Sequence, residues 1–329
     1  MADVYPDTPA GRDRWILSRR GPRAAPDARR AAAAFVEPER SEAGEVVPVA
    51  TVFLVNRECP WRCLMCDLWR HTLEEAVPPG ALPAQLEGAL AGLPPARQIK
   101  LYNSGSFFDA RAVPPADHPA IAARVAGFER VIVECHPSLV GEAVPRFRDR
   151  LAGRLEVAMG LETAHPQALE KLNKRMTLDL FARAAEFLRR EDIALRAFIL
   201  VQPPFLPDPA EARVWARRSV EFALETGATV AALIPTRGGN GALEALAAAG
   251  VFRPPTLATL EAALDDGLAV AQARGRGRVF ADLWDLEAFS DCAVCLPARR
   301  ERLARLNLRQ AWEPRPSCAC LGPAPEVRP

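Results

Sequence analysis

The chain has 329 residues, 49% of them hydrophobic, and its 42 basic and 41 acidic residues leave a formal net charge of +1. This length and apolar content allow a large buried core, as one barrel or two ordinary domains. The balanced charge argues neither for nor against a nucleic-acid partner. No stretch reaches the length of a transmembrane helix, and eight cysteines in short clusters indicate metal ligation rather than secreted disulfides, so we expect a cytoplasmic protein without a membrane partner.

The first segment, residues 1–46, is rich in Pro, Ala, Arg and Asp and lacks a sustained apolar period. This composition predicts an N-terminal extension that is partly disordered or wraps the surface. Its twin arginine, Arg19 and Arg20, is followed by an apolar run too short for an export signal. We assign the extension no chemistry.

Residues 47–285 alternate short β-rich runs with longer helical segments, which predicts an α/β domain of repeated β-α units around a parallel sheet. Thr177 and the helically spaced apolar residues after it predict one such helix. Six or seven units in this length favour a partial or complete barrel, although the pattern alone also allows an open sheet. The predicted strands are residues 51–55, 98–102, 130–134, 155–160, 195–201, 229–234 and 278–282.

Three cysteines follow the first of these strands. Cys59, Cys63 and Cys66 are separated by three and then by two residues. Three thiolates on one loop supply three corners of a cubane iron-sulfur cluster and leave the fourth iron open, whereas a cluster for electron transfer alone usually takes four protein ligands. An open iron can be chelated by the amino and carboxylate groups of S-adenosylmethionine (SAM). The alternative is half of a zinc site or a redox pair, but apart from His71 no further ligand is near in sequence.

The cysteine loop resembles that of the radical SAM superfamily. With the segment Asn-Ser-Gly-Ser-Phe-Phe-Asp that starts at Asn103, it is most similar to archaeosine-synthase-type and elongator-catalytic-subunit-like members, which act on tRNA. The resemblance implies a partial (βα)6 TIM-like barrel over residues 47–285 and a [4Fe-4S] cluster on the three cysteines. It further implies that the enzyme reductively cleaves SAM to a 5'-deoxyadenosyl radical, which abstracts hydrogen from a substrate. Its electron would come from a donor such as flavodoxin or ferredoxin.

The resemblance also assigns residues at the strand ends to SAM. The turn of Ser104, Gly105 and Ser106 is similar to the small-residue motif whose carbonyls meet the SAM amino group, because a larger side chain would keep backbone and ligand apart. Glu162 maps to the ribose and Lys174 to the methionine carboxylate. The alternatives are a plain glycine turn and a cation at a helix end. Gln202 and the two prolines after it replace the glycine-proline turn that many members of the superfamily have at this strand end. The sequence assigns no catalytic residue.

The segment 286–329 forms a small C-terminal tail with a second group of cysteines. Cys292 and Cys295 precede a predicted helix at 297–309, and Cys318 and Cys320 follow it. Four thiolates suit a closed structural zinc site or an auxiliary iron-sulfur cluster, and the residues alone do not decide between them. The alternative is a tail with unpaired thiols. Cys135 stands alone and is interpreted as a core residue, and its neighbour His136 as polar lining of the barrel.

Several arginines of the predicted C-terminal helix fall on one face and suggest contact with RNA phosphates. A solvated face with acidic neighbours is the commoner explanation of such a pattern. The arginines concerned are Arg299, Arg300, Arg302, Arg305 and Arg309.

These observations leave three hypotheses for function. The first is a radical SAM enzyme that modifies a nucleotide of tRNA, and the second is one that modifies a small metabolite or peptide. The third is a non-enzymatic metal or redox protein in which both cysteine groups are closed sites.

Overall fold

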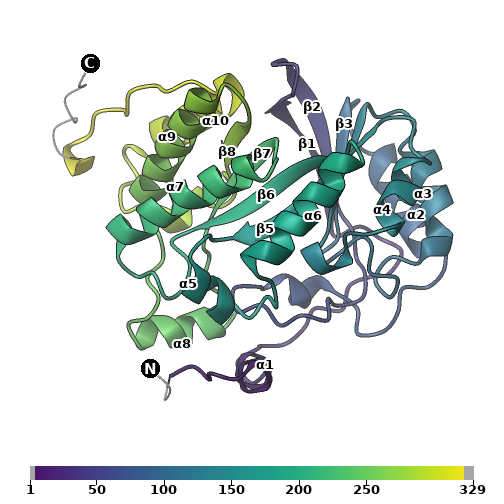
Figure 1. Cartoon of the computed structure of the whole chain (residues 1–329), viewed down its shortest axis with the longest axis horizontal. Helices are drawn as coiled ribbons and strands as arrows, with labels where there is room; N and C mark the ends of the chain where they lie inside the picture. The colour runs from purple at the N-terminus through teal and green to yellow at the C-terminus, as the bar shows by residue number, and fades with distance from the viewer. Residues whose placement is uncertain (1–3, 322–329) are drawn as a thin grey trace.

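The computed structural model describes residues 4–321, and these residues form one eight-stranded sheet. Its strands lie in the order in which they occur along the chain (Figure 1). The first pair, β1 and β2, is antiparallel, and each later pair is parallel. The strands are β1 (Ala33–Arg40), β2 (Val46–Phe53), β3 (Gln98–Tyr102), β4 (Arg130–Glu134), β5 (Arg154–Glu162), β6 (Ala194–Val201), β7 (Val230–Pro235) and β8 (Arg278–Ala281).

The predicted α/β class and partial parallel barrel are confirmed, because β2 to β8 coincide with the seven predicted strands to within a few residues. β1 is the strand that sequence reasoning missed. It lies within residues 1–46, the segment predicted as an extension, and pairs along its whole length with β2, from Ala33 opposite Phe53 to Arg40 opposite Val46. Its pattern is hard to recognise because Glu37, Pro38 and Glu39 interrupt the apolar alternation.

The helices that connect the parallel strands lie along the outside of the sheet (Figure 1). Helix α6 shows the sequence logic of these connections: Thr177 accepts a hydrogen bond from the Leu180 amide and so caps its start, as predicted. The helices are α1 (Pro9–Leu17), α2 (Ala81–Ala91), α3 (His118–Arg124), α4 (Ala143–Arg148), α5 (Pro166–Lys171), α6 (Leu178–Arg190), α7 (Pro209–Glu225), α8 (Ala242–Ala248), α9 (Leu257–Arg274) and α10 (Leu296–Arg309). No helix among residues 4–321 is long and apolar enough to cross a membrane.

Charged side chains from several strands meet in a buried network on the sheet. Lys100 of β3 and Arg196 of β6 both contact Glu39 of β1, each at 2.6 Å. Arg196 also pairs with Glu156 of β5 at 2.7 Å, and Arg130 of β4 reaches the same carboxylate at 3.1 Å. Because a buried charge is tolerated only when it is paired, this network couples β1 to four later strands.

Helix α10 covers the edge strand β8. The side chain of Asn307 donates to the Ala281 carbonyl and accepts from the Ala281 amide, each at 2.8 Å. Gln310 makes the same pair of bonds with Val279, at 2.7 and 2.9 Å. α10 also contacts β1, where Arg40 donates to the Leu308 carbonyl. A helix therefore satisfies the strand edge that a complete barrel would pair with another strand.

Candidate metal centre and cofactor site

The cysteine loop directly follows β2 at the carboxyl end of the parallel strands. Cys59, Cys63 and Cys66 are each partly covered. Burial raises the pKa of all three thiols, to about 12 for Cys59, and neighbouring thiols of the loop raise those of Cys59 and Cys63 further. The cation of Lys174 opposes this effect at Cys59 and Cys63. The sulfurs therefore lie within electrostatic reach of one another and of the Lys174 cation, which favours the thiolate form that a metal ligand needs.

The loop backbone is held by polar groups from other parts of the chain. The Leu64 amide donates to the Leu172 carbonyl at 2.9 Å. The side chain of Asn173 donates to the Arg62 carbonyl, and that of Asn240 to the Leu64 carbonyl, both at 2.7 Å. Sequence reasoning gave neither asparagine this role, because neither a fixed spacing nor a motif links Asn173 or Asn240 to the loop.

The N-terminal segment also anchors the loop. Glu58, the residue before Cys59, pairs with Arg20 at 2.7 Å, with Arg62 at 3.0 Å and with Arg23. Although burial raises the pKa of Glu58, hydrogen bonds from Arg20 and Arg23 hold it below its ordinary value. This segment, to which the sequence analysis assigned no chemistry, is thus the support of the cysteine loop.

An apolar contact reinforces this support. Tyr5 and Ile16 pack in one buried cluster with Leu64 of the loop and with Leu243 and Leu246 of α8. α1 and α8 accordingly lie next to each other in Figure 1. Burial of these side chains favours a single position for the loop even without a bound metal.

The turn after β3 approaches the cysteine loop closely. A Cβ atom added to Gly105 would lie 3.4 Å from the Cβ of Cys59 and 3.9 Å from the side-chain nitrogen of Asn56. Ser104, the residue before it, adopts the left-handed conformation with φ of 52°. The Gly105 position therefore lies in van der Waals range of Cys59, and the predicted small-residue turn and the cysteine loop meet.

Glu162 and Lys174 form a buried ion pair with a distance of 2.5 Å between Oε1 and Nζ. Glu162 stands at a bulge near the end of β5 and has φ of 64°. A Cβ at Gly160 would come within 2.2 Å of both charged groups, so the missing side chain there makes room for the pair. Burial opposes the charge on Lys174, but Glu162 and the nearby Cys63 hold its pKa above the ordinary value.

His136 connects this pair to the cysteine loop. Its Nε2 lies 2.9 Å from the Lys174 carbonyl, to which it donates, and its ring stacks on Trp61 of the loop with centroids 3.9 Å apart. Burial and the Lys174 cation lower the pKa of His136 to about 4, so the ring is neutral. Its contacts are those of a positioning residue, while Cys135 beside it is buried in the core, as interpreted from the sequence.

Glu134, at the end of β4, accepts a hydrogen bond from the Asn103 amide at 2.8 Å. Burial raises its pKa to about 7 against the opposing effects of that amide and of Lys174. It lies at a predicted strand end, and sequence reasoning gave it no role. A buried carboxylate beside the turn of Ser104 makes this corner of the site favourable for a cation.

Buried polar atoms without partners mark the same region. The side-chain oxygens of Asn56 and Gln202 have no hydrogen-bond partner among residues 4–321, and neither polar atom of the Asn103 side chain has one. All three side chains are almost fully buried and follow β2, β3 or β6. Since buried polar groups are normally paired, these atoms fit the contact surface of a polar cofactor.

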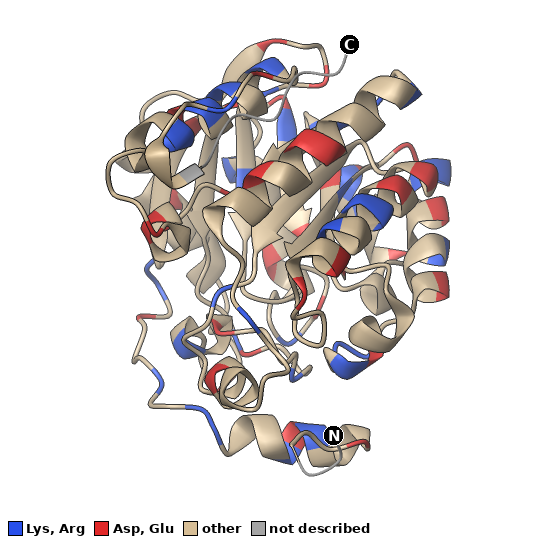
Figure 2. Ribbon diagram, turned by 90° about the vertical axis from the view of Figure 1, so that its left-hand side faces the viewer, with Lys and Arg blue, Asp and Glu red and all other residues tan. Residues whose placement is uncertain are grey.

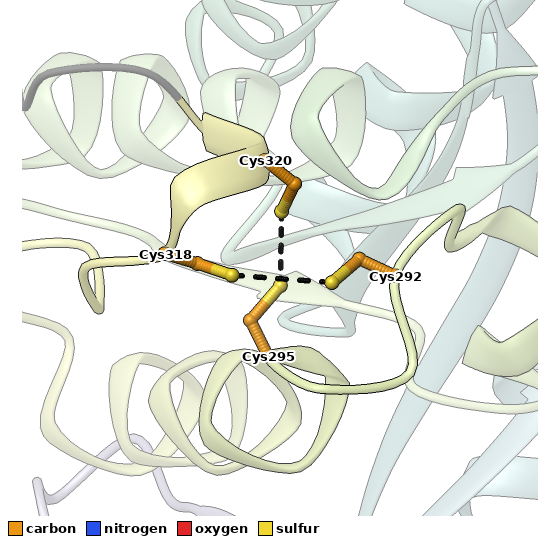
Figure 3. Close-up of side chains that lie close together, drawn as sticks. All are labelled: Cys292, Cys295, Cys318 and Cys320. Atoms are coloured by element: carbon orange, nitrogen blue, oxygen red, sulfur yellow. Dashed lines mark hydrogen bonds between the residues drawn. The ribbon is translucent and has the colours of Figure 1, made fainter.

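The C-terminal cysteines form a second group beside the start of α10. The sulfurs of Cys292, Cys295, Cys318 and Cys320 all lie within 4.8 Å of one another (Figure 3). The predicted helix between the two pairs is present as α10. The structure thus brings together the four residues that the sequence proposed as one ligand set. Residues 322–329 of the predicted tail and 1–3 of the predicted extension lie outside the described residues.

The arginines of α10 do not form the free basic face that RNA contact would need. Arg299 and Arg302 are buried and pair with Glu261 and Asp265 of α9, at 2.9 and 2.6 Å. The remaining three pair with Glu287 or Glu313. Tertiary packing supplies an acidic partner for every arginine that suggested RNA contact. Arg299 and Arg302 are buried, so neither the predicted RNA contact nor the alternative of a solvated face describes them. The side chains of Arg300, Arg305 and Arg309 are exposed beside their carboxylates, as the alternative of a solvated face with acidic neighbours predicts.

A scan against protein-family models finds no match. Archaeosine synthase subunit beta of Methanosarcina acetivorans is 29% identical to the chain over 219 residues, which cover 63% of each protein. The predicted resemblance to archaeosine-synthase-type proteins is therefore confirmed, and the chain spans slightly less than two thirds of this relative's length.

Two solved structures are also similar, in addition to this relative. The radical S-adenosylmethionine methyltransferase TsrM of Kitasatospora setae gives a TM-score of 0.46 at 19% identity and covers 63% of this chain and 40% of that one. Elp3 of the archaeon Methanocaldococcus infernus, with a deletion at its N-terminus, gives a TM-score of 0.48 at 12% identity and covers 69% of this chain and 58% of that one.

Proposed function

We propose that this chain is a radical SAM enzyme in which Cys59, Cys63 and Cys66 hold a [4Fe-4S] cluster. The observation that carries the proposal is the meeting of three elements: the three-cysteine loop, the close turn at Gly105 and the buried pair of Glu162 and Lys174. A closed zinc site would require a fourth ligand, whereas three thiolates leave one iron of a cluster for the methionine group of SAM.

The cluster and SAM, when bound, supply reductive cleavage of a carbon-sulfur bond and a 5'-deoxyadenosyl radical. The chain's own residues bind and orient the groups involved. The carbonyls of the turn from Ser104 to Ser106, with the carboxylate of Glu134 beside them, suit an ammonium group. Lys174 suits a carboxylate and Glu162 two ribose hydroxyls.

The ion pair between Glu162 and Lys174 has a further consequence for binding. Each partner now satisfies the other, so SAM must offer contacts that replace part of this pairing. A carboxylate near Lys174 keeps the cation satisfied, and ribose hydroxyls do the same for Glu162. We infer that SAM is bound by rearrangement of a paired site, with His136 holding the Lys174 backbone in place.

For the substrate, we propose a nucleotide of tRNA. The name of the Methanosarcina relative, archaeosine synthase subunit beta, favours RNA modification. Because the α10 arginines are paired, we assign phosphate contact instead to the chain between α1 and β1, where Figure 2 shows a succession of basic residues. Arg29 and Arg30 are exposed there, and the guanidinium of Arg19 lies 3.5 Å from the Trp15 ring centroid. The balanced net charge keeps a small metabolite or peptide as the alternative.

The cluster is tested by anaerobic reconstitution with iron and sulfide, followed by iron analysis and by detection of 5'-deoxyadenosine after addition of SAM and dithionite. We expect about four irons per chain and formation of 5'-deoxyadenosine in the native protein. The Cys59→Ala variant should lose both, and Cys135→Ala, a control at a cysteine outside the loop, should keep them. Zinc in the loop together with no SAM affinity would establish the non-enzymatic alternative.

The substrate is tested by gel retardation of bulk tRNA at increasing salt. Phosphate contacts predict binding that weakens steeply with ionic strength and that is reduced in the Arg29→Glu/Arg30→Glu variant. The matched control is Arg217→Glu/Arg189→Glu, two exposed arginines on outer helices. Equal retardation of all three proteins would refute the assignment. Mass spectrometry of tRNA nucleosides and metabolites from cells with and without the gene then separates the two substrate classes.

A further inference from the structure

We propose that Cys292, Cys295, Cys318 and Cys320 bind a single zinc ion, and that this ion clasps helix α10 over the open edge of the barrel. The proposal does not depend on the function of the cysteine loop. It resolves the choice between zinc and an auxiliary cluster, which the residues alone left open.

The distances between the sulfurs indicate one shared ion. Tetrahedral zinc with Zn–S bonds of about 2.3 Å places its four sulfurs roughly 3.8 Å apart. In the structure the sulfur of Cys292 lies 3.9 Å from that of Cys318, and the sulfur of Cys295 lies 3.5 Å from that of Cys320 (Figure 3). No pair exceeds 4.8 Å. A cubane would spread its ligands more widely, because each thiolate binds a different iron at the corner of the cube.

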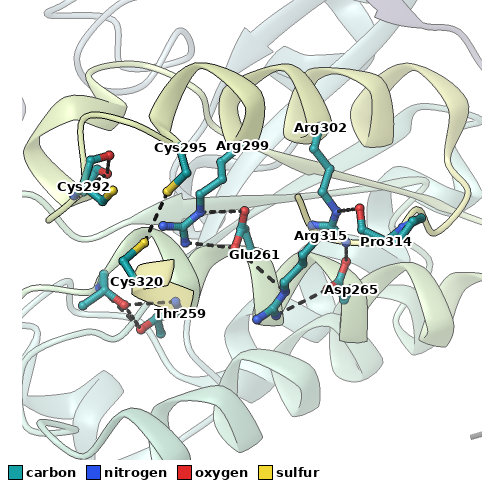
Figure 4. Close-up of polar contacts among 12 residues, drawn as sticks. Thr259, Glu261, Asp265, Cys292, Cys295, Arg299, Arg302, Pro314, Arg315 and Cys320 are labelled. Atoms are coloured by element: carbon teal, nitrogen blue, oxygen red, sulfur yellow. Dashed lines mark hydrogen bonds and ion pairs between the residues drawn. The ribbon is translucent and has the colours of Figure 1, made fainter. Parts of the chain in front are cut away.

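The surroundings of the sulfurs suit a site with net negative charge. The guanidinium of Arg299 approaches Cys295 and is held by two hydrogen bonds to the buried carboxylate of Glu261, at 2.9 and 3.1 Å (Figure 4). Four thiolates on Zn²⁺ carry a charge of −2, which the nearby Arg299 cation partly balances.

The position of the site explains what the ion would stabilise. Cys295 immediately precedes α10, whereas Cys318 and Cys320 follow the segment that returns along it. That segment is attached through Arg302, which is buried and donates to the Glu313 carbonyl at 2.6 Å. One ion therefore joins the start of the helix to the end of the returning segment.

The helix that is held in this way protects an edge strand. Asn307 and Gln310 of α10 satisfy the amides and carbonyls of Ala281 and Val279 in β8. Without the helix, these backbone groups would be free to pair with another chain. The tail is too short to bury a core of its own, so ligation is a source of free energy that holds α10 in place.

The test is metal analysis of the full-length native protein by mass spectrometry, with X-ray absorption at the zinc edge. We expect one zinc per chain with four sulfur ligands at about 2.3 Å. The Cys59→Ala/Cys63→Ala/Cys66→Ala variant should keep this zinc and lose iron, so failure of the cluster proposal and failure of the zinc proposal are distinguishable. The Cys292→Ser/Cys295→Ser variant should lose the zinc and melt at a lower temperature, whereas Cys135→Ala should keep it.

Three results would overturn the proposal. One is an iron-sulfur chromophore, or mononuclear iron, in the variant that lacks the three loop cysteines. Another is nitrogen or oxygen ligation of the bound zinc. The third is native protein that carries no zinc and takes up none when Zn²⁺ is added to the reduced chain. Because these measurements use native protein and the triple variant, they stand even if Cys292→Ser/Cys295→Ser fails to fold.

Discussion

Replacing Lys174 by Met tests whether the ion pair with Glu162 is a strongly coupled buried unit. Side chains of Lys174 and Glu162 are 12% and 7% exposed, and their charged atoms are 2.5 Å apart. Methionine keeps the length of the side chain and removes its charge. The carboxylate of Glu162 then stays in a buried position without its cation.

The magnitude follows from this burial. Removal of one partner of a buried ion pair costs about 3–5 kcal/mol, because the other charge is left uncompensated. Removal of both charges, in Glu162→Gln/Lys174→Met, should cost less than the sum of the two single variants. We expect an interaction free energy of about 2–3 kcal/mol between the two positions. Against a total stability of about 5–15 kcal/mol, each single variant should still fold.

The assay is equilibrium unfolding in urea, followed by circular dichroism under anaerobic, reducing conditions, for the native chain, both single variants and the double variant. The matched control is the pair of Arg213 and Asp266, which has contacts of 2.6 and 2.7 Å but an arginine that is 52% exposed. Arg213→Met should cost below about 1 kcal/mol. If the two single variants change the free energy of unfolding additively, or if each costs as little as Arg213→Met, Glu162 and Lys174 are not a strongly coupled buried pair.

Three further predictions concern the same end of the barrel. Gly160→Ala should lower the free energy of unfolding by about 1–3 kcal/mol, because its Cβ would meet Glu162 Oε1 at 2.1 Å. The control is Gly88→Ala, in open space on α2, which should raise the free energy of unfolding by about 0.4–1 kcal/mol in the same urea experiment. Glu134 has a folded-state pKa of about 7 against an ordinary 4.5, so the folded state binds its proton more tightly and stability falls as pH rises between these values, by about 3 kcal/mol in total. Unfolding curves from pH 4 to 8 should show this slope weakened in Glu134→Gln, and an unchanged slope would contradict the burial of that carboxyl group. Glu58→Gln should release iron from the reconstituted protein to a chelator faster than the native chain does, since three arginines lose their shared carboxylate, and an equal rate would show that this anchor is dispensable.

Local sequence patterns were sufficient for strands β2 to β8 and for the cysteine loop. Strands β2 to β8 were recognisable because each is a short apolar run that ends at polar or turn-forming residues. The spacing of Cys59, Cys63 and Cys66 was informative because ligands on one loop have a separation limited by the chain itself. The same holds for Thr177, whose cap depends on residues only three positions away.

Contacts between distant segments could not be read in this way. β1 is recognised as a strand only from its pairing with β2 in the folded chain. The same is true of the role of Glu39, whose partners lie on β3 and β6. The anchoring of Glu58 by Arg20 and Arg23 depends on how the first segment crosses the site. No periodicity encodes such contacts, because they arise from the packing of elements that are far apart along the chain.

The two cysteine groups and the alternation of strands and helices could be read from the order of residues, because chain spacing limits which groups can meet. Folding was needed to show that the C-terminal sulfurs lie close enough for one ion and that Arg299 and Arg302 pair with acidic side chains of α9. Burial and the competition among partners decide those contacts, and neither is local in the sequence.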